Sequence, residues 1–159
     1  MKIRVGFGFD VHQLQQGREF WLGGIKIQST KGAVGHSDAD VLIHAICDAL
    51  LGAAGMRDIG FHFPDTSTEL KGIDSKILLS RVMDLLKKEN YTIENIDCTI
   101  VLEHPKVNPH IDKIKQTLAP ILNINESDIG IKATTNEKMG FVGREEGICA
   151  YAVALIQKA

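Results

Sequence analysis

This chain of 159 residues has no run of basic residues and no long hydrophobic stretch. Its 18 lysines and arginines stand against 20 aspartates and glutamates, which gives a net charge of −2 at pH 7. That balance disfavours a nucleic-acid surface or an anionic-membrane surface, although a local anion site stays open. No stretch approaches the length of a membrane span. We therefore expect a globular protein with no nucleic acid and no membrane among its partners.

Cysteine is scarce and has no metal-binding or redox spacing. Cys47, Cys98 and Cys149 are scattered without a C-x-x-C pair, which is typical of reduced, buried thiols. The first residues, MKIRVGFGFD, show neither the apolar core of a signal peptide nor an Arg/Ser-rich transit pattern. These features predict a cytoplasmic location.

Common catalytic motifs are also missing from the sequence. It contains no G-x-S-x-G, no Walker A sequence and no G-x-G-x-x-G, and no cysteine stands beside a clear base. A protein nucleophile and a standard nucleotide-binding loop are therefore not predicted.

The apolar patterns predict one domain over residues 1–159 that mixes strands with three helices. Strands are expected at 2–12, within 91–103 and at 128–135, and REFWLGGIKI (18–27) is typical of a hairpin that turns at Gly23-Gly24. Helices are expected from Ser37 or Asp38 to about Gly55, from Asp74 or Ser75 to Asn90, and from Pro109 to about Leu122, where Pro120 should fray or bend the end. Residues 56–73 form a long connection of the kind used for lids. The fold class is an α/β or α+β two-layer sandwich.

Polar residues interrupt the first strand, GFGFDVHQL. Asp10 and His12 are two positions apart, so they face the same side of a strand. His44, within the first helix, shares a helix face with Asp40 and Asp48. Together Asp10, His12 and His44 could form a three-ligand Zn²⁺ site with an open fourth position, in which Asp48 would orient His44. The alternative is that these are ordinary strand and core residues.

The same strand carries Gly6 and Gly8, where another backbone can approach closely. We expect that neighbour to be a second subunit. The segment His36-Ser37-Asp38 fits either a helix cap or an anion site at a helix N-terminus.

A second polar stretch, KATTNEKMGFVGREEG (132–147), begins at the end of the strand expected at 128–135. Thr134 and Thr135 can donate to phosphate oxygens, and Glu137 suits Mg²⁺. Arg144 offers a planar donor pair for phosphate. A solvated polar turn explains the stretch about as well. His62, His104 and His110 show no partner spacing and are expected to be ordinary.

Four stretches resemble those of one family: GFGFDVHQL (6–14), GHSDADVLIHAICDALLGAAGMRDIGFHFPDTS (35–67), IDCTIVLEHPK (96–106) and IKATTNEKMGFVGREEGI (131–148). They resemble the 2-C-methyl-D-erythritol 2,4-cyclodiphosphate synthases of the non-mevalonate isoprenoid pathway, over essentially the whole chain. The resemblance implies a metal-dependent cyclising lyase. In this family the 2-phosphate of 4-diphosphocytidyl-2-C-methyl-D-erythritol 2-phosphate attacks the β-phosphate, and CMP leaves. The resemblance also favours a strand for 147–157 and a mixed sheet with three helices packed on one face.

The resemblance further implies metal ligands and catalytic residues. Asp10, His12 and His44 match the ligands of a divalent metal, usually Zn²⁺. Glu137 matches a ligand of Mg²⁺ or Mn²⁺ at the diphosphate. His36 and Thr135 match positions that stabilise the transition state.

Substrate contacts are implied for three segments, which would hold the methylerythritol, the cytosine and the phosphates. The matching positions are Asp10, His12, His36, Ser37, Asp58, Ile59, Gly60, Phe63, Pro64, Asp65, Thr66, Ser67, Leu102, His104, Pro105, Lys106, Val107, Asn108, Thr134, Thr135, Asn136, Glu137, Phe141 and Arg144.

The family forms homotrimers with active sites between subunits, and its central cavity accepts isoprenoid diphosphates near Phe9, Arg144 and Glu146. Asn136 and Glu145 depart from the pattern, which has threonine and a small residue, often glycine, at these positions. Glu145 adds negative charge beside Arg144, which counts against anion binding in the cavity. A phosphohydrolase that uses the same metal to activate water, or a non-catalytic module that binds isoprenoid diphosphates, are the alternative functions. The second would need no Asp10/His12/His44 set.

Overall fold

A mixed five-stranded sheet organises the computed structural model, which describes residues 2–158. The strands are β1 (Lys2–Gln16), β4 (Lys31–Val34), β5 (Tyr91–Val101), β6 (Ile129–Thr134) and β7 (Gly147–Lys158). Their order across the sheet is β4-β1-β7-β5-β6, and only β5 and β6 run parallel. The strand interpretation of 147–157 is confirmed, because β7 pairs with β1 on one side and β5 on the other.

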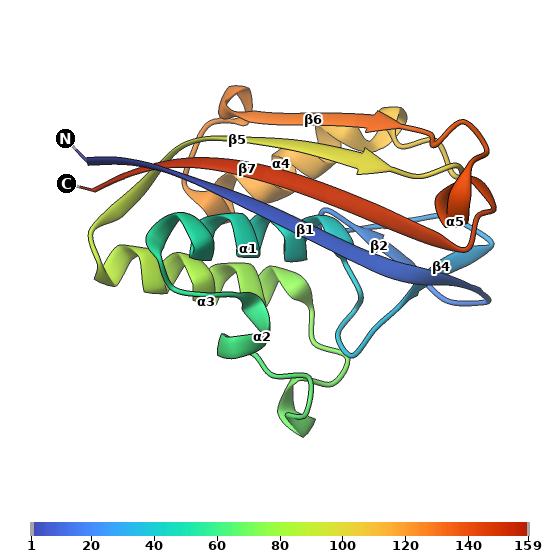
Figure 1. Cartoon of the computed structure of the whole chain (residues 1–159), viewed down its shortest axis with the longest axis horizontal. Helices are drawn as coiled ribbons and strands as arrows, with labels where there is room; N and C mark the ends of the chain where they lie inside the picture. The colour runs from blue at the N-terminus through green and yellow to red at the C-terminus, as the bar shows by residue number, and fades with distance from the viewer. Residues whose placement is uncertain (1, 159) are drawn as a thin grey trace.

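Three longer helices cover one face of this sheet (Figure 1). They are α1 (Val41–Ala54), α3 (Ser75–Lys88) and α4 (Ile111–Leu122). Helix α1 packs directly on β1 and β7, and α3 packs on α1. The remaining elements are short: hairpin strands β2 (Phe20–Leu22) and β3 (Ile25–Ile27), helices α2 (Ile59–His62) and α5 (Gly140–Gly143), and 3₁₀ turns η1 (Thr68–Leu70), η2 (Asn108–His110) and η3 (Glu126–Asp128). The predicted sandwich of a mixed sheet and three helices is confirmed.

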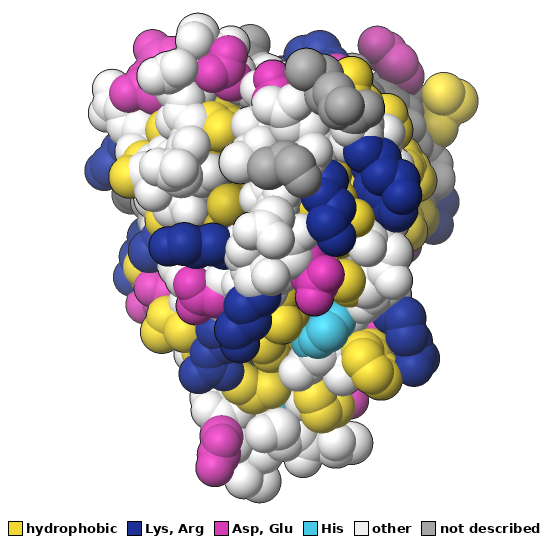
Figure 2. All heavy atoms as spheres, turned by 90° about the vertical axis from the view of Figure 1, so that its left-hand side faces the viewer, with side chains coloured by type: hydrophobic (Ala, Val, Ile, Leu, Met, Phe, Trp, Pro, Cys, Tyr) yellow, Lys and Arg dark blue, Asp and Glu magenta, His cyan; other side chains and the backbone are white. Residues whose placement is uncertain are grey.

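The hairpin is confirmed, with Gly23 and Gly24 at its turn and both at positive φ, +60° and +80°. Such a turn favours glycine because glycine has no Cβ to clash with the backbone. Within residues 2–158 no helix is long and apolar enough to cross a membrane. At the end of the molecule that carries the chain termini, basic and acidic side chains are interspersed (Figure 2).

Helix boundaries differ from the prediction at two places. Helix α1 begins after Asp40, whose side chain accepts from the N–H of Ile43, and not after Ser37 or Asp38. Asp38 is unable to cap α1 because its carboxylate is bound at the start of α3. Pro109 lies in the 3₁₀ turn that precedes α4, while Pro120 is accommodated within α4.

Helix α1 is buried on nearly every side because it lies between the sheet and α3. Its fully buried side chains include Leu42, Ile43, Ile46, Leu50 and Leu51. A polar side chain such as His44 on this helix is therefore held against the sheet by a closely packed scaffold.

Gly6 and Gly8 let α1 approach β1. A Cβ at Gly6 would lie 1.9 Å from the carbonyl oxygen of Ala49, and one at Gly8 would lie 1.9 Å from that of Ala45. The predicted close approach is confirmed, but the neighbour is helix α1 of the same chain and not a second subunit. Side chains alternate along a strand, so the face that approaches α1 also carries Asp10 and His12.

Replacing Gly8 by alanine should lower the free energy of unfolding by about 1–3 kcal/mol, because the new methyl group meets rigid backbone. Gly52→Ala is the matched control, since a Cβ at Gly52 on α1 meets nothing within 4 Å. That change should be neutral or stabilise the helix by about 0.5–1 kcal/mol. Urea unfolding measures both. Equal stabilities for the two variants would contradict the close-packing explanation.

Candidate active site

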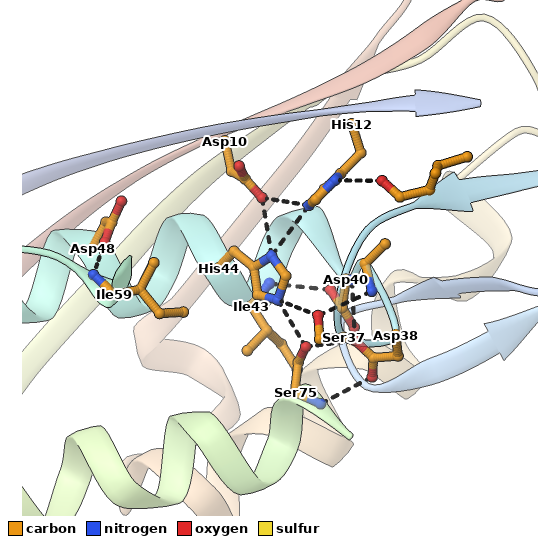
Figure 3. Close-up of polar contacts among 12 residues, drawn as sticks. Asp10, His12, Ser37, Asp38, Asp40, Ile43, His44, Asp48, Ile59 and Ser75 are labelled. Atoms are coloured by element: carbon orange, nitrogen blue, oxygen red, sulfur yellow. Dashed lines mark hydrogen bonds and ion pairs between the residues drawn. The ribbon is translucent and has the colours of Figure 1, made fainter. Parts of the chain in front are cut away.

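Asp10 and His12 of β1 meet His44 of α1 at the interface of sheet and helix (Figure 3). Asp10 Oδ2 lies 2.9 Å from His12 Nε2 and 3.0 Å from His44 Nδ1. The two imidazole nitrogens are 3.2 Å apart. These three ligand atoms form the metal-binding candidate among the residues that the structure describes.

The ring of His12 is oriented by the backbone. Its Nδ1–H donates to the carbonyl of Val34 at 2.9 Å, so the lone pair of Nε2 faces Asp10 and His44. Burial opposes ionisation of Asp10, but its contacts with the imidazoles of His12 and His44 outweigh it and lower its pKa to about 2. Burial also lowers the pKa of His12, but the Asp10 carboxylate outweighs this and raises it. The Asp10 carboxylate is therefore ionised at neutral pH and supplies one negative charge where a cation would bind.

The donor set fits a tetrahedral metal site. Ligand bonds of 2.0–2.1 Å to Zn²⁺ place neighbouring donor atoms about 3.3 Å apart, and the three separations here are 2.9, 3.0 and 3.2 Å. Two imidazoles and one carboxylate would leave the fourth position open for a substrate oxygen.

The predicted role of Asp48 is wrong. Its Oδ1 accepts from the N–H of Ile59 at 2.7 Å, and Figure 3 shows it directed away from the ring of His44. Both nitrogens of His44 have other partners: Asp10 at Nδ1, and Ser75 and Ser37 at Nε2. The i, i+4 spacing placed both residues on one helix face, but it left the directions of their side chains undetermined. Asp48 instead fixes the start of α2.

A cavity of about 400 Å³ opens beside the three ligand residues. Its wall includes the following residues expected to bind metal or substrate: His12, His36, Ser37, His44, Ile59, Gly60, Phe63 and Asp65. His36 Nε2 donates to the carbonyl of Ser67 at 2.8 Å, which ties the 64–67 loop to the cavity. Asp58 caps α2 by accepting from the N–H of Phe61. Pro64 and Thr66 lie in the same loop but are not part of the wall.

A larger cavity, of about 600 Å³, lies alongside, with Arg18 and Trp21 in its wall. Ser37 and Gly35 border both cavities, but none of the three metal-ligand candidates lines the larger one. We therefore assign the chemistry to the smaller cavity.

The other half of the expected substrate site forms a separate hollow of about 90 Å³. It is lined by Leu102, Pro105, Lys106, Val107, Asn108, Thr134 and Thr135. None of these residues lines the cavity beside His44. The structure therefore places the expected substrate residues in two groups, one around each cavity. The walls of these two cavities share no residue within the chain. His104 lines neither cavity. Its Nε2 lies 3.7 Å from Oε1 of Glu145.

Glu103 is a residue that the sequence reasoning missed. Its carboxylate is buried and accepts from the N–H groups of Asn136 and Lys138. Glu137 and Lys138 have positive φ, +52° and +61°, so this turn needs external support. Glu103 thus positions Glu137 beside Thr135. An acidic residue directly after the apolar residues Ile100, Val101 and Leu102 was the available signal.

Phe141 lies in α5 and Arg144 directly follows it, shortly before the start of β7. Phe141 and Glu146 line a third cavity, of about 380 Å³, together with His12. The guanidinium of Arg144 donates to both carboxylate oxygens of Glu146, at 3.0 and 3.2 Å. Glu145 has φ +58°, which explains why a glycine is favoured at this position.

Comparison with known proteins finds relatives that are similar to this chain in sequence and in fold. A 2-C-methyl-D-erythritol 2,4-cyclodiphosphate synthase from Parabacteroides distasonis is 66% identical over 158 residues, 99% of this chain and 98% of the relative. A solved structure described as IspF from Plasmodium falciparum in complex with CDP has a TM-score of 0.87 and 34% identity, over 99% of this chain and 98% of that chain.

A longer relative contains the same fold. The bifunctional IspDF from Campylobacter jejuni has a TM-score of 0.95 and 37% identity over 99% of this chain, which spans 43% of that protein. The model of the YgbB family matches residues 3–157. The chain belongs to the YgbB family.

Proposed function

We propose that this chain is a 2-C-methyl-D-erythritol 2,4-cyclodiphosphate synthase, a phosphorus–oxygen lyase of the non-mevalonate isoprenoid pathway. The observation that carries the proposal is the Asp10/His12/His44 donor set, of which His12 and His44 line a cavity of about 400 Å³. The names of the relatives and the CDP bound to one structural neighbour support it. The whole chain, residues 1–159, serves as one catalytic domain.

In the proposed reaction the substrate provides its own nucleophile. An oxygen of the 2-phosphate forms a bond to the β-phosphorus, the bond between this phosphorus and the oxygen of the α-phosphate breaks, and CMP leaves. The reacting groups are both negative, so the main obstacles are charge repulsion and alignment. The absence of a nucleophile motif in the sequence agrees with this chemistry.

Two divalent ions fit the proposed reaction. We assign Zn²⁺ to Asp10, His12 and His44, and Mg²⁺ or Mn²⁺ to a diphosphate site that includes Glu137. When bound, these ions supply Lewis-acid charge to the phosphates. His36 and Thr135 donate to phosphate oxygens as charge develops, and positioned donors of this kind are worth about 10²–10³ in rate.

Each of the two cavities would hold a different part of the substrate. The wall formed by α2 and the 63–67 loop, with Asp58, Ile59 and Gly60, would hold the methylerythritol. The hollow at 102–108, which includes Lys106, would hold the cytosine. Thr134, Asn136, Phe141 and Arg144 complete the substrate contacts.

A homotrimer would join these halves across subunits. The sheet face opposite the helices carries exposed apolar side chains: Ile3, Val5, Phe7, Phe9, Val11, Tyr151 and Val153. The rings of Phe9 and Tyr151 contact each other across the β1–β7 pair, with their centroids 5.1 Å apart and their planes tilted by 43°. Such a continuous apolar face is typical of an interface between copies. An isoprenoid diphosphate in the resulting central cavity would compete with Glu146 for Arg144.

We place the protein in the cytoplasm, which its three free cysteines support. Incubation with 4-diphosphocytidyl-2-C-methyl-D-erythritol 2-phosphate, Mg²⁺ and Zn²⁺ tests the function. We expect a cyclic diphosphate and CMP, identified by mass and phosphorus NMR. Release of inorganic phosphate without a cyclic product would instead indicate a phosphohydrolase.

A further inference from the structure

The ring nitrogen of His44 that does not face Asp10 contacts the start of α3. This nitrogen, Nε2, lies 2.8 Å from the hydroxyl of Ser75, the first residue of α3, which has no exposed surface (Figure 3). A buried hydroxyl at this point of the fold is unusual because α3 otherwise buries apolar side chains. Its position indicates a specific role toward the imidazole.

The partners of Ser75 determine the direction of these hydrogen bonds. The Ser75 hydroxyl has one proton and lies within hydrogen-bond distance of Asp38 Oδ1. An ionised carboxylate only accepts, so Ser75 donates to Asp38 and accepts from His44 Nε2–H. The proton of His44 therefore lies on Nε2, and the lone pair of Nδ1 faces Asp10.

Asp38 is itself fixed in place. Its Oδ2 accepts from the backbone N–H of Ser75 at 2.9 Å, and its Oδ1 accepts from the N–H of Asp40 at 3.1 Å. The loop before α1, helix α1 and the start of α3 thus meet at one point. Ser37 also approaches His44 Nε2, at 3.1 Å, but its hydroxyl accepts from the N–H of Ala39 and contacts no carboxylate in the described structure.

We propose that Ser75 and Asp38 are positioning residues for the metal site. The chain His44–Ser75–Asp38 fixes His44 as the Nε2–H tautomer and increases the basicity of Nδ1 toward the cation, as outer hydrogen-bond partners of metal-bound histidines do. This role replaces the one expected of Asp48. The inference rests on the metal site of the proposed function, but its test measures Zn²⁺ binding and does not require turnover.

Ser75→Ala should lower the Zn²⁺ affinity of the purified protein by about 10- to 100-fold, measured by competition with a chromophoric chelator. Ser80→Ala is the matched control, because Ser80 is an exposed serine of the same helix; its affinity should equal that of the parent protein. An unchanged affinity in Ser75→Ala would overturn the proposal.

A second measurement separates positioning from a purely structural role. Long-range ¹H–¹⁵N NMR of the metal-free protein should show the His44 proton on Nε2. A proton on Nδ1 would overturn the proposed hydrogen-bonded chain His44–Ser75–Asp38. A structural role alone would lower the unfolding temperature of the metal-free protein and leave Zn²⁺ affinity and tautomer unchanged.

Asp38→Asn keeps the side-chain shape and removes the charge, so it serves if Ser75→Ala does not fold. We expect a loss of Zn²⁺ affinity in the same direction as for Ser75→Ala, but smaller, because Ser75 can still donate to the amide oxygen. Wild-type affinity in Asp38→Asn would remove Asp38 from the proposed hydrogen-bonded chain. If the parent protein binds Zn²⁺ but forms no cyclic product, the proposed function fails while the positioning role of Ser75 and Asp38 stands.

Discussion

Replacing His44 by alanine is expected to abolish stoichiometric Zn²⁺ binding and to reduce turnover by at least about 10²–10³-fold, the loss typical when one charge-stabilising contact is removed. His44 supplies one of only three donor atoms, which lie within 4.8 Å of one another. A catalytic Zn²⁺ site needs three protein ligands and one open position, and the two remaining donors are too few to form it. Metal analysis of the dialysed protein and product formation measure the two effects.

His110→Ala provides the control for the His44 variant. His110 is the last residue of η2, and it lines neither the cavity beside His44 nor the hollow around Lys106. Its replacement should leave metal content and rate unchanged. Full Zn²⁺ occupancy in His44→Ala would refute the ligand assignment, whatever happens to the rate.

Mixing two inactive variants should restore activity if the active site lies between subunits. One variant is His44→Ala, which damages the cavity beside the metal site. The other combines Lys106→Ala with Thr135→Ala, which damages the hollow that no residue of the first cavity lines. A trimer that contains both variants has one intact site in three, because each site draws on two neighbouring copies in a fixed order.

Co-expression of differently tagged copies, followed by purification through both tags, gives the mixed assembly for this test. The readout is cyclic product per protomer, together with the mass from sedimentation. Each variant assembled alone should stay inactive. If the mixture is as inactive as its components, each site must be built within one chain, and the proposed trimeric arrangement of the site fails.

Local patterns in the sequence determined the elements and half of the metal site. Alternation along β1 placed Asp10 and His12 on one face, and the glycines at Gly6 and Gly8 indicated a close neighbour. Strand periodicity and turn residues act over a few positions, so they can be read directly. Residue types suggested His44 as the third ligand and the family resemblance strengthened that prediction, because its position opposite the strand depends on how α1 packs against the sheet.

Only the tertiary structure decided the contacts between side chains that are distant in sequence. Helical spacing favoured Asp48 as the partner of His44, whereas the fold gives that role to Ser75, 31 positions away. Likewise, Glu103, two residues after the end of β5, supports the turn at Asn136 and Lys138. The sequence by itself determined which residues share a face. Which of them touch depends on the packing of α1 and α3, because side-chain direction is fixed by neighbours that no local pattern specifies.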